Sequence, residues 1–167
     1  KVKQLNKQKY PVSIKVRVHE RGLSSAVIEG FKLAKGNIYL VMDADLSHPP
    51  EKIPDIVQPI ISGKAEFVVG SRFVEGGSAE HFNIYRKLNA WISKMLAMPF
   101  TKVKDPMAGF FAFDARLLTP EILPILNPLG FKIGLEMIVK CKPKTVVEIP
   151  ITFKERLYGK SKLSTRE

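Results

Sequence analysis

Two uninterrupted apolar runs constrain the fold of this chain more than any other feature. The first is NIYLVM, residues 37–42, and the second lies within AEFVVG, residues 65–70. A strand with one wet face alternates apolar and polar residues, whereas a strand that is covered on both faces does not. Because helices must cover both faces of such a strand, these runs indicate the centre of an α/β sheet.

Segments of helical periodicity alternate with the apolar runs. In SSAVIEGFKLAKG, apolar side chains recur at helical spacing, with Ser24 or Ser25 as the expected cap and Gly36 as the stop. The alternating segment SIKVRVHE predicts a strand over 13–20. The other expected elements are helices over 50–64, 82–97 and 134–141, a strand or a strand turning into a helix over 108–118, and a strand over 144–153. The helix over 82–97 carries an apolar stripe, formed by Ile84, Leu88, Trp91, Ile92 and Met95. This alternation predicts an α/β fold with a mostly parallel sheet flanked by helices.

The opening of the chain departs from this pattern. Residues 1–9 are polar and rich in lysine, whereas doubly wound folds normally begin on a buried strand that carries part of the nucleotide site. No Gly/Ser-rich linker or internal repeat divides the sequence. We therefore expect residues 1–167 to form a single, partial domain that lacks its N-terminal strands.

Charge and composition limit the classes of partner. The formal net charge is +11 at pH 7, which favours anionic partners such as nucleic acid, anionic lipid headgroups or phosphorylated small molecules. Cys141 is the single cysteine, so an intracellular, reducing setting is expected. No apolar stretch approaches the roughly 20 residues that span a bilayer.

Two aspartates, Asp43 and Asp45, follow the first apolar run directly. In parallel α/β sheets the ligand crevice lies outside the carboxyl ends of the strands. Residues two apart in a strand point to the same side, so both carboxylates face one space if the extended geometry persists. Two carboxylates that face one space repel each other. A bound Mg²⁺ or Mn²⁺, which prefers hard oxygen ligands such as carboxylates, relieves the repulsion. The alternative is a turn in which Asp45 caps the following helix.

Basic residues suited to phosphate follow at two places. The second apolar run ends in Gly70, Ser71 and Arg72, and the segment KERLYGKSKL carries Arg156, Lys160 and Lys162 around Gly159. Arginine supplies a bidentate fork to phosphate and lysine a point charge. Together with the acidic pair, these residues suggest chemistry on a diphosphate, whose departure the cation and the arginines assist. A merely solubilising surface is the alternative for the second segment.

The sequence resembles a known family, the dolichyl-phosphate mannose synthases. The resemblance rests on five motifs in order, spans about Arg21 to Ser164, and is carried by RGLSSAVIEGFKLAKGNIYLVMDADLSHPP, GSRF, DPMAGFFAF, LEMIVK and EIPITFKERLYGKSKLS. These enzymes are inverting family 2 glycosyltransferases with a GT-A-type fold. The resemblance implies transfer of mannose from GDP-mannose to a membrane polyprenyl phosphate, such as dolichyl phosphate.

The resemblance also implies roles for individual residues. Asp43 and Asp45 bind the donor diphosphate and the metal, which is Mg²⁺ or Mn²⁺, and Ser47 joins the metal shell. Catalysis is assigned to Asp43, Asp45 and Arg156. Donor binding also involves Arg72, Arg156 and Lys162, and the acceptor phosphate contacts Arg72, Arg86 and Lys162. Asp105 and Glu136 fall where the family has sugar-facing or structural acids.

No strong general base is needed for this reaction, because a lipid phosphate is already anionic near neutral pH. Catalysis is then mainly positioning and charge neutralisation. His19, His48 and His81 are scattered along the sequence and are interpreted as structural or peripheral.

The chain departs from the family at three places. Several relatives have glutamine where this chain has Ser47, and serine is common where it has Ala108. The opening strand and the second strand of the family, which contact the nucleotide, have no counterpart in the sequence. We therefore expect this fragment alone to be weakly active or inactive.

Three alternatives stay open. The first is the same chemistry with another sugar, such as transfer of glucose from UDP-glucose to dolichyl phosphate. The second is a basic nucleic-acid-binding module, against which the absence of a zinc, helix-turn-helix or RNA-binding signature counts. The third is a non-catalytic membrane-surface domain. For the transferase we expect peripheral contact with the cytoplasmic face of a membrane, and no nucleic acid partner.

Overall fold

The central element is a mixed four-stranded sheet. The computed structural model describes residues 12–79 and 84–154, except for the side chains of 84–87. The strand order is β1 (Ile38–Val41), β4 (Phe111–Asp114), β2 (Phe67–Ser71) and β5 (Val146–Pro150). Strands β1, β2 and β5 run in one direction, while β4 pairs antiparallel with both β1 and β2. The predicted α/β class is therefore confirmed, with one reversed strand inside the sheet.

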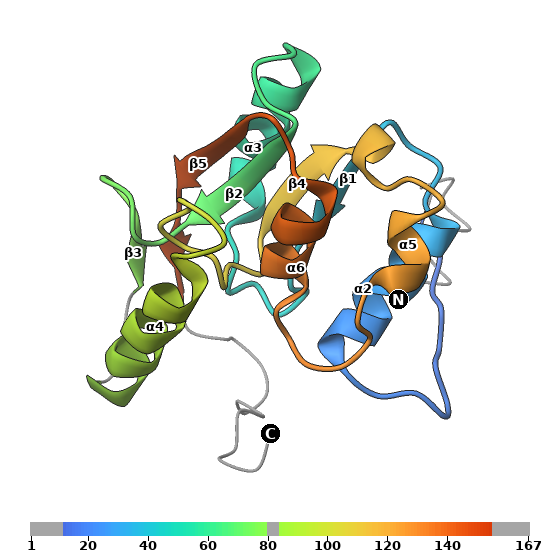
Figure 1. Ribbon diagram of the computed structural model, residues 1–167, viewed down its shortest axis with the longest axis horizontal. Helices are drawn as coiled ribbons and strands as arrows, with labels where there is room; N and C mark the ends of the chain where they lie inside the picture. The colour runs from blue at the N-terminus through green and yellow to red at the C-terminus, as the bar shows by residue number, and fades with distance from the viewer. Residues whose placement is uncertain (1–11, 80–83, 155–167) are drawn as a thin grey trace.

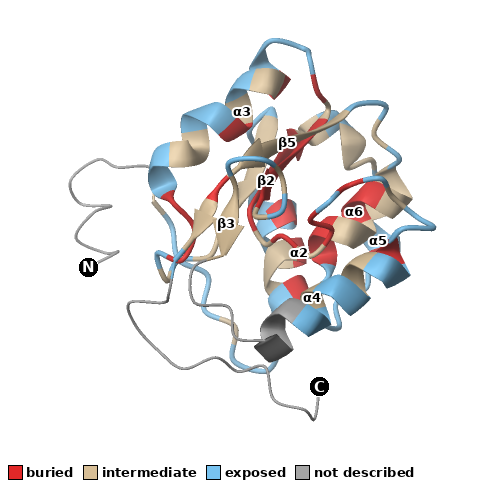
Figure 2. Cartoon of the chain, turned by 90° about the vertical axis from the view of Figure 1, so that its left-hand side faces the viewer, coloured by how far each residue is buried: buried red, intermediate tan, exposed pale blue. Residues whose placement is uncertain are grey.

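Two apolar layers explain why the strand sequences are apolar without interruption. On β2, Phe67 and Val69 belong to one core cluster and Val68 to the other. The first cluster includes Phe31 of α2 (Leu23–Leu33) and Met137 of α6 (Ile133–Cys141). Helix α3 (Ile53–Ile61) covers the opposite face. Figure 1 shows α2 and α6 on one side of the sheet and α3 on the other, and in Figure 2 the buried residues gather between these layers.

Short elements complete the described fold. The 3₁₀ helices are η1 (Pro50–Lys52) and η2 (Ala115–Leu117), and α5 (Ile122–Ile125) is a single turn. Strand β4 thus passes directly into η2, which agrees with the expected strand turning into a helix. A second sheet pairs β3 (Ser78–Ala79) in parallel with β6 (Thr152–Phe153). It joins the segment that follows β2 to the segment that follows β5.

The strand expected over 13–20 is wrong. Residues 12–20 form no strand, and the apolar members of the pattern, Ile14, Val16 and Val18, are 61%, 71% and 76% exposed. None of the described strands pairs with this segment. An alternating pattern becomes a strand only when a neighbour completes its backbone hydrogen bonds and covers its apolar face.

Helix α2 begins differently from the expectation. Its N-cap is Gly22, at φ 119°, and Ser24 and Ser25 both lie inside the helix. The Ser25 hydroxyl accepts a hydrogen bond from Arg17 at 2.6 Å and lies 3.2 Å from the carbonyl oxygen of Gly22. The helix also ends at Leu33, three residues before Gly36. Ser25 therefore contacts the residues that precede the helix from within its first turn.

Helix α4 (Ile84–Ala97) confirms the predicted helix but exposes its apolar stripe. The exposed members are Leu88, Trp91, Ile92 and Met95, and the exposed apolar surface continues over Leu96, Met98 and Phe100. Figure 1 shows α4 beside the end of the main sheet, away from the other helices. Within the described part of the chain, no helix combines the length and the apolar character needed to cross a bilayer.

Candidate active site

The acidic pair lies in a loop at the carboxyl end of β1. The strand ends at Val41, and Ala44 and Asp45 already form a turn. The condition for aligning Asp43 and Asp45, an extended backbone, is therefore not met, and the alternative of a turn is observed. Both aspartates are partly exposed. The pair is presented by a shaped loop rather than by a strand.

Local hydrogen bonds fix the Asp45 carboxylate. Its Oδ1 accepts the backbone N–H of Ser47 at 3.0 Å and the Ser47 hydroxyl at 2.5 Å. Between them, Leu46 adopts φ 63°, in the left-handed region that is unfavourable for a leucine. Such a conformation persists when its surroundings determine it and is common at functional sites. Ser47 is fully buried, and its hydroxyl contacts Asp45; its role as a metal ligand stays a prediction.

Arg72 directly follows β2. Because β1 and β2 run in one direction, Arg72 lies at the same end of the sheet as the loop that carries Asp43 and Asp45. Its Nε and Nη2 donate to the two carboxylate oxygens of Asp105 at 2.8 and 2.7 Å, and its backbone N–H donates to Oδ2 at 2.9 Å. The Asp105 side chain is 0% exposed and that of Arg72 13%. The guanidinium also lies 5.3 Å from the ring centroid of Phe73 and 5.5 Å from that of Phe153.

Asp105 is held in place from the far edge strand. Glu148 of β5 accepts the backbone N–H of Lys104 at 2.8 Å and that of Asp105 at 3.1 Å. Glu148, Asp105 and Arg72 thus form one connected set. Of the two expected roles for Asp105, sugar-facing or structural, these contacts favour the structural one.

Glu136 also has local partners. It accepts the backbone N–H of Asn127 at 2.6 Å and forms an ion pair with Lys140 one turn later on α6. Lys140 donates in addition to the carbonyl oxygen of Ile125. Glu136 therefore ties α6 to the segment that follows α5, and a structural role accounts for its contacts.

His48 is a site residue that the sequence reasoning missed. It is 3% exposed, and its Nδ1 accepts the backbone N–H of Asp43 at 3.1 Å. Burial lowers the pKa of His48 below its ordinary value; the Asp43 carboxylate opposes this effect and Arg72 adds to it. The carboxylates of Asp45 and Asp105 also oppose this lowering of the His48 pKa. His48 thus lies among the charged residues that were predicted separately. Its place three residues after Asp45 was the available signal.

A family model decides what kind of domain carries this loop. The model described as glycosyl transferase family 2 matches residues 1–119, which include Asp43, Asp45 and Arg72. The chain belongs to glycosyl transferase family 2.

Three curated relatives of this glycosyl transferase family 2 domain carry the same name. Dolichol-phosphate mannosyltransferase from Pyrococcus furiosus is 46% identical over 93% of this chain and 44% of the relative. The protein of that name from Saccharomyces cerevisiae is 40% identical over 94% of the chain and 60% of the relative, and that from Mycosarcoma maydis 39% over 97% and 55%. The chain thus spans about half the length of the curated relatives it matches.

Solved structures confirm the fold of the family 2 domain. Glucosyl-3-phosphoglycerate synthase from Mycobacterium tuberculosis, in complex with phosphoglyceric acid, has a TM-score of 0.58 at 18% identity. This match covers 88% of the chain and 50% of the synthase. A second complex of the synthase, with Mn²⁺, UDP-glucose and phosphoglyceric acid, gives 0.57 at 15% identity, with the same coverage. At such identities the likeness shows the GT-A-type fold alone.

Three predicted site residues of the family 2 domain are not placed with the others. Arg86 lies in the first turn of α4, and its side chain is outside the described part of the structure. Arg156 and Lys162 lie outside the described residues. The backbone N–H of Lys154 donates to the carbonyl oxygen of Ser47 at 3.1 Å. Lys154 is therefore attached to the aspartate loop.

Cys141 is unsuited to act as a nucleophile. It lies at the end of α6, where burial raises the pKa of its thiol to about 11. A thiol reacts as the thiolate, and near neutral pH Cys141 is almost wholly protonated. Its position supports a packing role against Met137, whose sulfur lies 4.0 Å away.

Proposed function

We propose that the protein transfers mannose from GDP-mannose to dolichyl phosphate, with inversion at the sugar carbon. The observation that carries the proposal is the Asp43–Asp45 loop at the carboxyl end of β1, beside Arg72 at the end of β2. This is the sheet edge at which α/β folds bind their ligands. The shared name of the curated relatives supports the choice of sugar and acceptor.

The residues of the aspartate loop fit a divalent cation. Asp43 and Asp45 supply hard carboxylate oxygens, which suit Mg²⁺ or Mn²⁺. Among the described residues no group of three or more His, Cys, Asp or Glu side chains can hold a metal ion. A Mg²⁺-type site needs only one or two carboxylates, because substrate phosphates and water complete its shell. When bound, the cation neutralises charge on the departing diphosphate.

The chain's own residues perform the rest by positioning. Ser47 holds the Asp45 carboxylate through a hydrogen bond to its Oδ1, and Asp105 fixes the Arg72 guanidinium at the carboxyl end of β2. The acceptor phosphate is its own nucleophile, so no side chain has to remove a proton. Arg86, Arg156 and Lys162 are proposed to bind the donor and acceptor phosphates.

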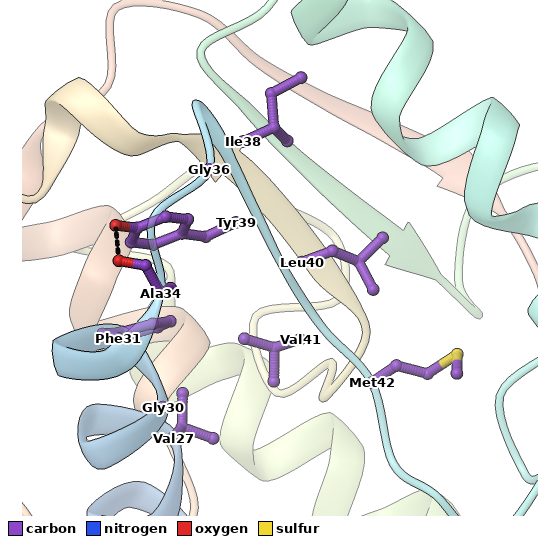
Figure 3. Close-up of a pocket in the computed structure, with 10 residues that line it drawn as sticks. All are labelled: Val27, Gly30, Phe31, Ala34, Gly36, Ile38, Tyr39, Leu40, Val41 and Met42. Carbon is purple, nitrogen blue, oxygen red and sulfur yellow. Dashed lines mark hydrogen bonds between the residues drawn. The ribbon is translucent and has the colours of Figure 1, made fainter. Parts of the chain in front are cut away.

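We also propose that the donor site is completed at the free edge of β1. Among the described strands, β1 pairs only with β4. Beside its other edge lies a groove of about 360 Å³, between β1 and α2. Its lining is largely apolar and includes Val27, Phe31 and Tyr39, whose hydroxyl donates to the Ala34 carbonyl oxygen (Figure 3). A strand from outside the described residues fits this edge, because an unpaired strand edge and its apolar flank need a cover.

The proposed lipid acceptor requires contact with a membrane, and α4 offers the surface for it. Its exposed stripe includes Trp91, which is 59% exposed. Residues 84–104 contain Arg86, Lys87, Lys94, Lys102 and Lys104 and no acidic residue. Apolar residues with Trp beside basic ones are typical of helices that lie on an anionic membrane surface. We propose peripheral contact through this stripe at the cytoplasmic face.

Replacing Trp91 by serine should weaken binding to vesicles that contain phosphatidylserine by about tenfold, because a large interfacial side chain is lost. Cosedimentation of the full-length protein with the vesicles measures the effect. Ile61→Ser is the matched control, since Ile61 is 63% exposed on α3. Equal binding by the Trp91 variant and the unaltered protein would rule out this contact surface.

Two measurements test the function: protection of the protein against thermal unfolding by the nucleotide sugar, and transfer of mannose to dolichyl phosphate. With Mn²⁺ and GDP-mannose at about 100 times Kd, the Tm of the full-length protein should rise by roughly 5–10 °C. EDTA should abolish the rise. Radiolabelled mannose should then appear in the lipid fraction. Protection and transfer by UDP-glucose instead would show the glucosyl reaction, and metal-independent DNA binding without protection would contradict both.

A further inference from the structure

The backbone of Asp43 leaves the sheet at a point where no strand holds it. The β1–β4 register ends at the pair Val41 and Phe111, so the Asp43 N–H lies beyond the ladder. Its hydrogen bond goes instead to His48 Nδ1, at 3.1 Å. An imidazole nitrogen accepts a hydrogen bond only when it is unprotonated. In this geometry the ring is therefore neutral, with its proton on Nε2.

The His48 ring is itself fixed on two sides. It stacks on Phe110, with ring centroids 5.3 Å apart and an interplanar angle of 23°, and meets the edge of Phe153 at 5.3 Å. Phe110 is fully buried and anchored to β2, since its carbonyl oxygen accepts the Gly70 N–H at 2.8 Å. The ring therefore links the Asp43 backbone to the sheet through Phe110.

Gly109 leaves the space that this arrangement needs. A Cβ at residue 109 would lie 3.3 Å from His48 Cε1 and 3.8 Å from Asp43 Oδ2. The ring and the carboxylate thus share one confined space beside the loop. Any shift of the ring changes where Asp43 is held.

We propose that His48 is a positioning residue: its Nδ1 holds the Asp43 amide and thereby sets the placement of the Asp43 carboxylate relative to that of Asp45. The inference rests on the proposed function, in which these two carboxylates bind the cation and the donor diphosphate. His48 contacts neither ligand in this proposal. It acts through Asp43, as Ser47 acts through Asp45. Partners that orient metal ligands typically change metal affinity by 10- to 100-fold when they are removed.

Three replacements separate this role from packing. His48→Asn places an amide oxygen near the position of Nδ1 but removes most of the ring. His48→Phe keeps the ring and its stacking on Phe110 but removes the acceptor. His48→Gln keeps a polar group but extends it toward the position of Nε2. If His48 only packs, the Phe variant should resemble the unaltered protein most closely; if it positions Asp43, the Asn variant should.

The measurement is the Kd of Mn²⁺ for the full-length protein in the presence of GDP, followed by the EPR signal of free Mn²⁺. We expect a rise of about tenfold or more for His48→Phe and His48→Gln, and of less than about threefold for His48→Asn. His19→Phe is the matched control, because His19 is exposed. If the Phe variant does not fold, the comparison of Asn with Gln decides.

Two other outcomes overturn the inference in distinguishable ways. If Asp45→Asn abolishes Mn²⁺ binding while the Phe variant binds as the unaltered protein does, His48 has no positioning role and the proposed function stands. If the unaltered protein shows no Mn²⁺ binding with GDP, the inference and the proposed function fail together.

Discussion

Replacing Asp45 by asparagine should lower kcat for mannose transfer by about 100-fold or more in the full-length enzyme. Asparagine is isosteric, and its Oδ1 can still accept the two hydrogen bonds from Ser47 that fix the side chain. The variant therefore retains the loop and loses the charge. Since the proposed cation is held by the charge of two carboxylates, removing one weakens both cation binding and the neutralisation of the leaving diphosphate.

The control for this variant is Asp55→Asn on α3. Asp55 is an exposed carboxylate that pairs with Lys52 at 2.8 Å, and its loss should leave kcat unchanged. Turnover with radiolabelled GDP-mannose and dolichyl phosphate, at saturating Mn²⁺, measures both variants. Undiminished turnover by Asp45→Asn would refute the role of the aspartate loop.

The sequence predicts the layered fold well because a strand that is buried on both faces has an uninterrupted run of apolar residues. Phe67, Val68 and Val69 are consecutive, and they enter opposite core clusters. Such a run is typical of a strand between two covered faces. The order of the strands in the sheet has no corresponding pattern in the sequence. That β4 lies between β1 and β2, and runs against both, follows from tertiary packing.

The site was predicted in its parts but not in its connections. Asp43, Asp45 and Arg72 were found because each follows an apolar strand. The pair of Arg72 with Asp105 spans 33 residues, and no local pattern announces it. The sequence predicts only a structural or peripheral role for His48, because its contact with Asp43 depends on the turn at Leu46, whose φ of 63° is not expected of a leucine. Through-space contacts of this kind are set by the fold.

Replacing Asp105 by alanine should lower the free energy of unfolding by about 3–5 kcal/mol, the range found when one partner of a buried ion pair is removed. Asp105 is fully buried and accepts three hydrogen bonds from Arg72. Without it, a largely buried guanidinium loses the carboxylate that accepts from its Nε and Nη2. Urea unfolding of the full-length protein should show a lower midpoint at an unchanged m-value.

Asp55→Ala removes a carboxylate from an exposed pair and should cost less than about 1 kcal/mol. The double variant Asp105→Ala/Arg72→Ala tests the cause. Because the two residues stabilise each other, the loss in the double variant should be smaller than the sum of the two single losses. A loss equal to that sum would show that Asp105 stabilises the fold independently of Arg72. In that case the guanidinium at the sheet edge would be positioned by other contacts, and the donor site would not depend on Asp105.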